Sequence, residues 1–218
     1  MEITHIGHAC FRIKGDNTTL VIDPYKGDSV GYKFPAQKCD VLLTSHDHDD
    51  HYNVAEVTGY KLLVDTPGEY EVAGTFIQGI HTFHDGEEGA TRGKNTIFLI
   101  EIDGFTLLHL GDLGHELAKE TLENIPEIDV LMIPVGGTYT IGPETAAKVI
   151  SSVEPGFVIP MHFQTKDLTG LSEKLKTVDE FLDEMGIENG SSAKDKLVLK
   201  SKSDVPEETE VVLLKPAH

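Results

Sequence analysis

Eight residues, Thr44–His51, carry three histidines and three aspartates directly after an apolar run. Imidazoles and carboxylates are the ligands that a divalent metal of borderline hardness binds. If the preceding strand continues in extended form, His46 and His48 point the same way, because side chains two residues apart share a face. A turn after His48 then directs Asp50 and His51 to a neighbouring point. A solvated polar loop explains single residues of these types but not this density, so we interpret the loop as supplying two ligands to each of two adjacent metals.

Further ligand-type residues follow other apolar runs, at the points where strands are expected to end. They are Asp23 after Leu20–Ile22, His84 after the strand through Ile80, Asp112 after Thr106–Leu110 and His162 after Phe157–Met161. Positions just past strand ends are where a rigid sheet brings side chains together. We therefore expect these residues to converge on one cleft.

The order of these residues resembles the pattern of the metallo-β-lactamase superfamily. The pattern is His46-x-His48-x-Asp50-His51, a later histidine, Gly111-Asp112 and a final His162, with Asp23 upstream, and it extends from Ile3 to about Phe163. Shorter motifs resemble the branch of small single-domain hydrolases related to the ascorbate-phosphate lactonases; they are Ile6-Gly7-His8-Ala9, Asp23-Pro24, His109-Leu110-Gly111-Asp112, Pro134-Val135-Gly136-Gly137 and Ile159-Pro160-Met161-His162. The resemblance implies an α/β protein: a four-layer αββα sandwich of two mixed sheets with helices outside and two metals between the sheet edges.

The resemblance also implies a division of the ligands between the two metals. The first metal would be held by His46, His48 and His84, the second by Asp50, His51 and His162, with Asp112 as the bridge and Asp23 orienting a ligand histidine. We expect two divalent ions, zinc first, although these ligand types also admit manganese and iron. Either His81 or His84 fits the third histidine, and we favour His84 because it opens a polar loop.

Several other side chains are candidates for the cleft. His8 follows the first strand and either lines the cleft or is a hydrogen-bonded structural histidine. His115 follows the bridging Asp112 and either donates a proton to a leaving group or caps a helix. Arg92 and Lys94 are rare positive charges after His84 that can hold an anionic substrate group, with surface charge as the alternative. Tyr139, which follows two glycines at a strand end, is a further substrate-binding candidate.

Apolar runs and turn residues predict mainly strands up to Leu110, and alternating helices and strands afterwards. Asp103-Gly104 is a two-residue hairpin signal, and Thr177 with Glu180 forms a capping box. The expected helices are His115–Ile125, Pro143–Val153 and Thr177–Met185, and residues 25–38 are expected to form a surface loop. Because no linker or repeat interrupts the chain, residues 1–218 are predicted to form a single domain.

The composition restricts the partners and the compartment. The chain has 18 Lys+Arg against 37 Asp+Glu, a formal net charge of −19, which disfavours nucleic acids and anionic membrane surfaces. Two cysteines do not form a disulfide framework, and no signal peptide or membrane-spanning run is visible. We therefore expect a cytoplasmic protein acting on a small molecule; the sequence leaves its oligomeric state open.

The predicted activity is metal-dependent hydrolysis. Two metals that share a carboxylate can hold a hydroxide at neutral pH, and Asp50 is placed to orient it and take its proton. That chemistry suits a lactone, a phosphate ester or a phosphodiester. A nuclease, a di-iron redox protein and a non-catalytic metal-binding protein are the alternatives on the same ligand set. Neither a Gly-x-Ser-x-Gly element nor a Gly-Lys-Ser/Thr phosphate loop occurs.

Overall fold

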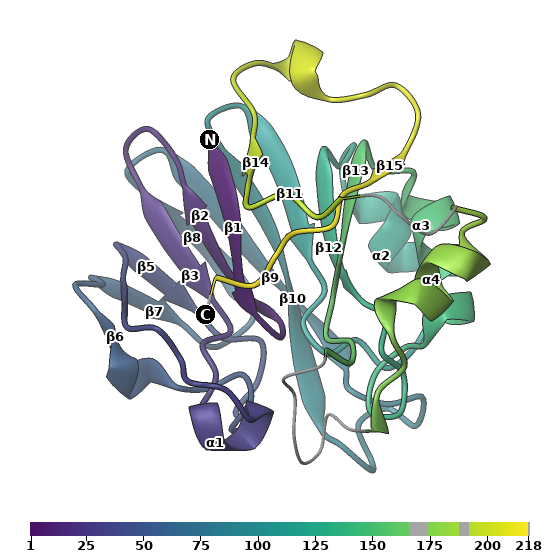
Figure 1. The fold of residues 1–218 in the computed structure, drawn as a ribbon. Helices are drawn as coiled ribbons and strands as arrows, with labels where there is room; N and C mark the ends of the chain where they lie inside the picture. Colours follow the sequence, from purple (N-terminus) through teal and green to yellow (C-terminus); the bar gives the residue numbers. More distant parts are fainter. Residues whose placement is uncertain (166–173, 188–191, 218) are drawn as a thin grey trace.

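Two β-sheets pack face to face in the computed structural model, which describes residues 1–165, 174–187 and 192–217 (Figure 1). The first sheet has the strand order β14-β1-β2-β3-β5-β7. In that order its strands are Leu197–Val198, Glu2–Gly7, Cys10–Lys14, Thr19–Ile22, Val41–Leu43 and Leu62–Val64. Strands β1 to β3 pair antiparallel, and β3, β5 and β7 pair parallel, so the sheet is mixed as predicted.

The second sheet has the order β15-β13-β12-β11-β10-β9-β8 and is also mixed. In that order its strands are Glu210–Val211, Phe157–Met161, Val130–Pro134, Phe105–His109, Lys94–Ile102, Thr75–Phe83 and Gly68–Val72. A small third sheet pairs β4 (Gln37–Lys38) with β6 (Val57–Thr58). The predicted Asp103-Gly104 hairpin joins β10 to β11, and both turn residues have the positive φ that such a turn requires.

Alternating side chains of β10 divide between two hydrophobic cores. Phe98 and Ile100 join the core between the sheets, whereas Ile97 and Leu99 join the core under the helices. A strand covered on both faces needs this nearly continuous apolar sequence. The nearly continuous apolar sequence of β10 therefore accounts for its place as an inner strand of the sandwich.

The longer helices cover the outer face of the second sheet (Figure 1). They are α2 (Lys119–Asn124), α3 (Pro143–Val153) and α4 (Val178–Glu184), and short 3₁₀ turns lie at Val54–Glu56 and Lys202–Asp204. The predicted bounds of α3 are confirmed, with Pro143 in the first turn. The predicted capping box of Thr177 and Glu180 begins α4.

Two predicted segments differ from the structure. The helix predicted from His115 begins only at Lys119, because Gly114 N–H bonds to the Phe83 carbonyl and Leu113 accepts from Ile141, which holds this segment in an irregular path. Residues 25–38 are more than a surface loop. They contain α1 (Gly27–Val30) and β4, and Tyr25 and Phe34 pack a third core against the outer face of the first sheet.

Within the described residues, no helix is long and apolar enough to cross a membrane.

Candidate metal centre

The predicted ligands gather where parallel strands of both sheets end. Strands β1, β3 and β5 run the same way in the first sheet, as do β9, β11 and β13 in the second. The residues that follow these strands come together at the edge near α1, the lower edge in Figure 1. They are His8, Asp23, the loop at Thr44–His51, His84, Asp112 and His162.

Left-handed backbone turns several of these side chains toward the centre. His8, Asp23 and His162 have φ values of 54°, 50° and 52°, each directly after a strand. Such a conformation costs a non-glycine residue about 1 kcal/mol or more and persists where the surroundings enforce it. Here the N–H of His162 bonds to the His8 carbonyl at 3.1 Å, which ties the ends of the two sheets together.

The Asp112 carboxylate lies in the middle of the histidines. Its Oδ2 is 3.2 Å from His84 Nε2, 3.3 Å from His162 Nε2 and 4.0 Å from His46 Nε2, and its Oδ1 is 3.1 Å from His51 Nε2. The side chain is almost fully buried. One carboxylate therefore faces histidines of both predicted ligand sets, as a bridging ligand requires.

The other donors form two groups near Asp112. The nearest donor atoms of His46, His48 and His84 all lie within 4.8 Å of one another. The second group joins Asp50, His51 and His162, also within 4.8 Å, and includes His8. These two groups contain the residues of the two ligand sets that the resemblance implies, with His8 beside the second set, and a third group of His46, His51 and Asp112 connects them.

The structure brings His84, not His81, into a donor group. Strand β9 ends at Phe83, so His84 is the first residue beyond it and is buried. His81 lies inside the strand, exposed, and lines a neighbouring cavity. Residues three apart on a strand point to opposite faces, which accounts for the separation.

One carboxylate, Asp23, orients a histidine of each set. Its Oδ2 accepts from His51 Nδ1 at 2.9 Å and from the Ser45 hydroxyl at 2.7 Å. Because the single Ser45 proton goes to Asp23, Ser45 Oγ accepts from His46 Nδ1 at 2.9 Å. Both histidines then carry their protons on Nδ1 and present Nε2 to the centre. Asp23 was predicted to orient a ligand; the sequence did not single out Ser45.

Asn95 and His109 hold the backbone of the Gly111-Asp112 turn. Asn95 Oδ1 accepts from Asp112 N–H at 2.9 Å, while its amide donates to the Leu110 carbonyl at 3.0 Å. His109 Nδ1 accepts from Gly111 N–H, so Nε2 donates to the Ala9 carbonyl at 3.0 Å. Gly111 has φ 52°, and a Cβ there would collide with Asn95. These contacts fix the position from which Asp112 projects.

Electrostatics prepares three of the donors, His46, His8 and Asp112, for a metal. Burial lowers the pKa of His46 to about 3 and that of His8 to about 4, which keeps both imidazoles neutral. Burial opposes ionisation of Asp112, but His162 and His51 outweigh it and hold its pKa well below the usual value.

His51 differs from the other donors. Burial acts to lower its pKa, but Asp112, Asp50 and Asp23 raise it well above the usual value. A metal at His51 must therefore displace a proton, and its apparent affinity falls as the pH falls below that raised pKa.

Buried polar atoms without partners test whether a metal fits. Among the described residues, three buried atoms of the centre make no hydrogen bond: His46 Nε2, His51 Nε2 and Asp112 Oδ1. His51 Nε2 and Asp112 Oδ1 are 3.1 Å apart, but their geometry is not that of a hydrogen bond. Buried groups of this kind normally find a partner or bind an ion. Nitrogen and carboxylate oxygen are donors suited to zinc, manganese and iron, so the residues fit divalent metals.

A cavity of about 560 Å³ opens over the centre. His48, Asp50, His84 and Asp112 line it together with Arg92 and Tyr139. Lys94 lies in an adjoining cavity of about 680 Å³ that is also lined by His46, His48, His81 and Arg92. Two of the three predicted substrate-binding residues thus reach the metal cavity itself.

His115 lies apart from the donor groups. Its Nε2 accepts from Phe83 N–H at 3.3 Å, so Nδ1 donates to the Glu116 carbonyl at 2.7 Å. Both ring nitrogens are engaged with backbone next to the end of β9. His115, the predicted proton donor, therefore holds the segment after Asp112 against the end of β9.

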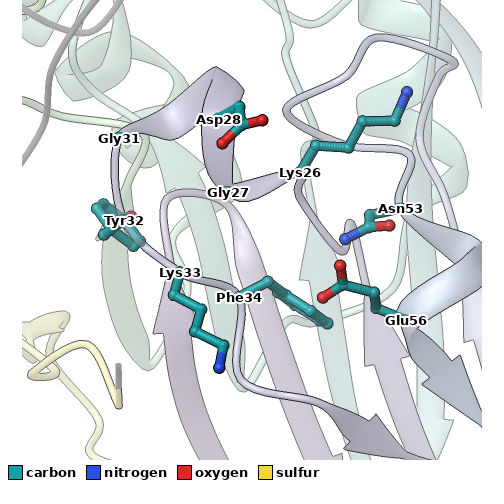
Figure 2. A pocket seen from close by; sticks show the side chains of 9 residues that line it. All are labelled: Lys26, Gly27, Asp28, Gly31, Tyr32, Lys33, Phe34, Asn53 and Glu56. Carbon is teal, nitrogen blue, oxygen red and sulfur yellow. The ribbon is translucent and has the colours of Figure 1, made fainter.

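A separate cavity of about 710 Å³ lies beside α1 (Figure 2). Two of its polar lining groups are already committed, since Lys26 pairs with Asp49 and the Asn53 amide donates to the Tyr25 carbonyl. No histidine is among the described residues that line it. We do not assign it to the centre.

Replacing Ser45 with alanine should weaken metal binding at the His46 set. Without the hydroxyl, His46 Nδ1 loses its acceptor and its proton position is no longer fixed. Loss of such a partner typically weakens metal affinity by about 10- to 100-fold. Stepwise zinc titration against a competing chelator measures this. Ser45→Thr, which keeps the hydroxyl, should stay closer to the wild type, and equal affinities for all three proteins would contradict the assigned role.

Comparisons with known proteins agree with this geometry. The model of the beta-lactamase superfamily domain matches residues 2–162. A UPF0173 metal-dependent hydrolase of Pelotomaculum thermopropionicum is 30% identical over 195 residues, covering 76% of this chain and 85% of the relative. One from Pyrococcus abyssi is 29% identical over 193 residues, with the same coverage. A Thermotoga maritima crystal structure, named as a candidate Zn-dependent hydrolase of the metallo-beta-lactamase superfamily, is 38% identical, with TM-score 0.76 over 98% of this chain and 97% of that one. The chain therefore belongs to the beta-lactamase superfamily and is a metal-dependent hydrolase of the metallo-β-lactamase fold.

Proposed function

We propose that this chain hydrolyses a small substrate with the help of two divalent metals. The two ligand sets and Asp112 would hold these metals, which would supply an ionised water for the reaction. The observation that carries the proposal is the position of Asp112, whose Oδ2 lies 3.2 Å from His84 Nε2 and 3.3 Å from His162 Nε2, one histidine from each ligand set. Zinc is the first candidate, because the Thermotoga maritima relative is named for zinc dependence. A cavity of about 560 Å³ suits a small molecule such as a lactone, a phosphate ester or a phosphodiester.

The residues have distinct tasks in this mechanism. Bound divalent metals supply a water that ionises near neutral pH and stabilise negative charge on the substrate. Asp50 is the candidate proton acceptor: its Oδ2 lies 3.3 Å from His8 Nε2, and its pKa stays low because His51 and His8 outweigh the effect of burial. His8 holds this carboxylate toward His51 and His162. Arg92 and Tyr139 line the cavity where the substrate would bind.

The cellular setting is part of the proposal. Cys10 and Cys39 are free and buried, which fits small core residues in a reducing compartment. The net charge of −19 favours a small-molecule substrate over a nucleic acid. We therefore propose a cytoplasmic enzyme of small-molecule metabolism.

The protein isolated under mild conditions should bind about two metals per chain. The reason is the presence of two donor groups with Asp112 close to both. Elemental analysis before and after loading with Zn²⁺ or Mn²⁺ measures the stoichiometry, and a panel of lactones and chromogenic phosphodiesters measures hydrolysis. A metal content that stays at zero after loading would refute the two-metal centre; full loading without turnover of any panel member would refute the proposed substrate classes.

A further inference from the structure

His8 is a buried histidine that the predicted division of the ligands does not use. Its donor atom and those of Asp50, His51 and His162 all lie within 4.8 Å of one another. His8 Nε2 is 3.3 Å from Asp50 Oδ2, whereas the Nε2 atoms of the other two histidines are 3.9 and 4.0 Å from that oxygen. Zinc binds nitrogen and oxygen at about 2.1 Å, so neighbouring donors of a tetrahedral site lie about 3.4 Å apart. His8 therefore has the separation from Asp50 that two ligands of one ion require.

The ring of His8 differs from those of the structural histidines near it. His109 bonds to backbone groups with both ring nitrogens, and His5 Nε2 donates to the His8 carbonyl at 2.9 Å. Among the described residues, the His8 ring has no backbone partner, and its Nδ1 is buried without a hydrogen bond. The predicted ligands His84 and His162 share this pattern, with Nε2 at the centre and Nδ1 buried without a hydrogen bond. The surroundings of His8 are therefore those of a ligand.

The backbone holds His8 beside the second ligand set. Gly7 has φ 146°, and a Cβ there would lie 2.8 Å from the Tyr32 ring, so glycine lets the turn after β1 pack against this tyrosine. The His8 carbonyl accepts from His162 N–H at 3.1 Å, and the centres of the two imidazole rings are 4.0 Å apart. His8 is thus fixed next to a predicted ligand, which reduces the entropy lost when a metal binds.

The two donor groups differ in their access to the cavity over the centre. His48 and His84 of the first group line this cavity, and His48 is exposed. The described residues that line it do not include the histidines of the second group, His8, His51 and His162, and all three are buried. Catalytic zinc sites have three protein ligands and an open position, whereas structural sites have four. The first group therefore resembles an open site and the second a closed one.

We propose that His8 is a fourth protein donor of the second ligand set and binds through Nε2. His8 and Asp50, which contact each other at 3.3 Å, then share one ion, and the neutral imidazole carries its proton on Nδ1. The first set, with three histidines, keeps the open position at which water and substrate bind. This inference rests on the two-metal centre proposed above and adds a residue to it.

Replacing His8 with glutamine separates a metal ligand from a hydrogen-bond partner. The glutamine amide can still donate to Asp50, but it does not replace the imidazole as a ligand for zinc or cobalt. Loss of an indirect partner of a metal typically lowers affinity about 10- to 100-fold, so for His8→Gln we expect one of two Co²⁺ ions to bind about 100-fold more weakly or worse. Titration against a competing chelator measures both affinities. His81→Gln is the matched control, because His81 is exposed and outside the donor groups.

Proton NMR of the protein saturated with Co²⁺ counts the bound histidines. The paramagnetic ion shifts the N–H protons of bound imidazoles far outside the usual range, and a buried Nδ1 such as that of His8 exchanges its proton slowly with water. His8→Gln should lose one shifted signal, and His81→Gln none. His8→Asn should lose the same signal; asparagine tolerates the φ of 54° at this position, so this variant separates the loss of a ligand from backbone strain.

The outcomes distinguish this inference from the proposed function. Wild-type affinities with every shifted signal present in His8→Gln would overturn it, because His8 then only orients Asp50. A weakened site that keeps every shifted signal at saturation would overturn it equally. If the wild type takes up no Co²⁺, the two-metal centre fails and the role of His8 with it. Two bound ions and the expected loss in His8→Gln, without turnover of any substrate, would support His8 as a ligand and refute the proposed hydrolysis alone.

Discussion

Replacing Asp112 with asparagine is expected to lower kcat/KM by about a thousandfold or more. In the proposed mechanism the Asp112 carboxylate would bridge two metals with its negative charge, which an amide of the same size cannot do. Metal activation of the nucleophile with charge stabilisation typically provides several kcal/mol of rate enhancement. The carboxylate is also the shared partner of His84, His162 and His51. Steady-state kinetics on the preferred substrate, with elemental analysis of the same sample, measures the effect and its cause.

Asp103 offers the matched control for this substitution. It lies in the turn between β10 and β11, one strand away from Asp112, with φ 53°, and asparagine tolerates that conformation. Its Oδ2 accepts from Asp16 N–H at 3.0 Å, a contact that an asparagine oxygen can keep. Asp103→Asn should therefore retain wild-type turnover and metal content. Equal losses of turnover in two folded variants would show that Asp112 has no special role.

The positions of the candidate metal-donor residues follow a rule that can be applied to the sequence alone. A histidine or aspartate directly after an apolar run lies at a strand end, and parallel strand ends share an edge. The run Val41–Leu43 and the loop after it, Gly111-Asp112 and Met161-His162 all obey this rule. The end of β9 was predictable for the same reason, since the polar, glycine-rich segment after His84 cannot continue a strand.

The supporting residues were not predictable, because their roles depend on how distant segments meet. Ser45 is one of several small polar residues in its loop until the end of β3 brings Asp23 against it. Asp85 has the composition of an ordinary loop carboxylate, and only the folded loop directs four backbone N–H groups at it. For His115 the sequence left two roles open, a proton donor in the cleft or a helix cap. In the structure both its ring nitrogens bond to backbone groups, and it lies outside the donor groups.

Replacing His84 with alanine should remove about one metal per chain, whereas His81→Ala should retain wild-type occupancy. His84 Nε2 lies 3.2 Å from Asp112 Oδ2, and a donor atom of His84 lies within 4.8 Å of the His46 and His48 donors. Loss of this side chain leaves that set with two histidines. Sites of this type normally use at least three protein ligands. His81 is exposed within β9, and its removal leaves both donor groups intact. Elemental analysis after dialysis against a fixed free Zn²⁺ concentration compares the variants, with circular dichroism to verify folding. Loss of metal in His81→Ala with full occupancy in His84→Ala would reverse the assignment and require β9 to end at Ile80, three residues earlier.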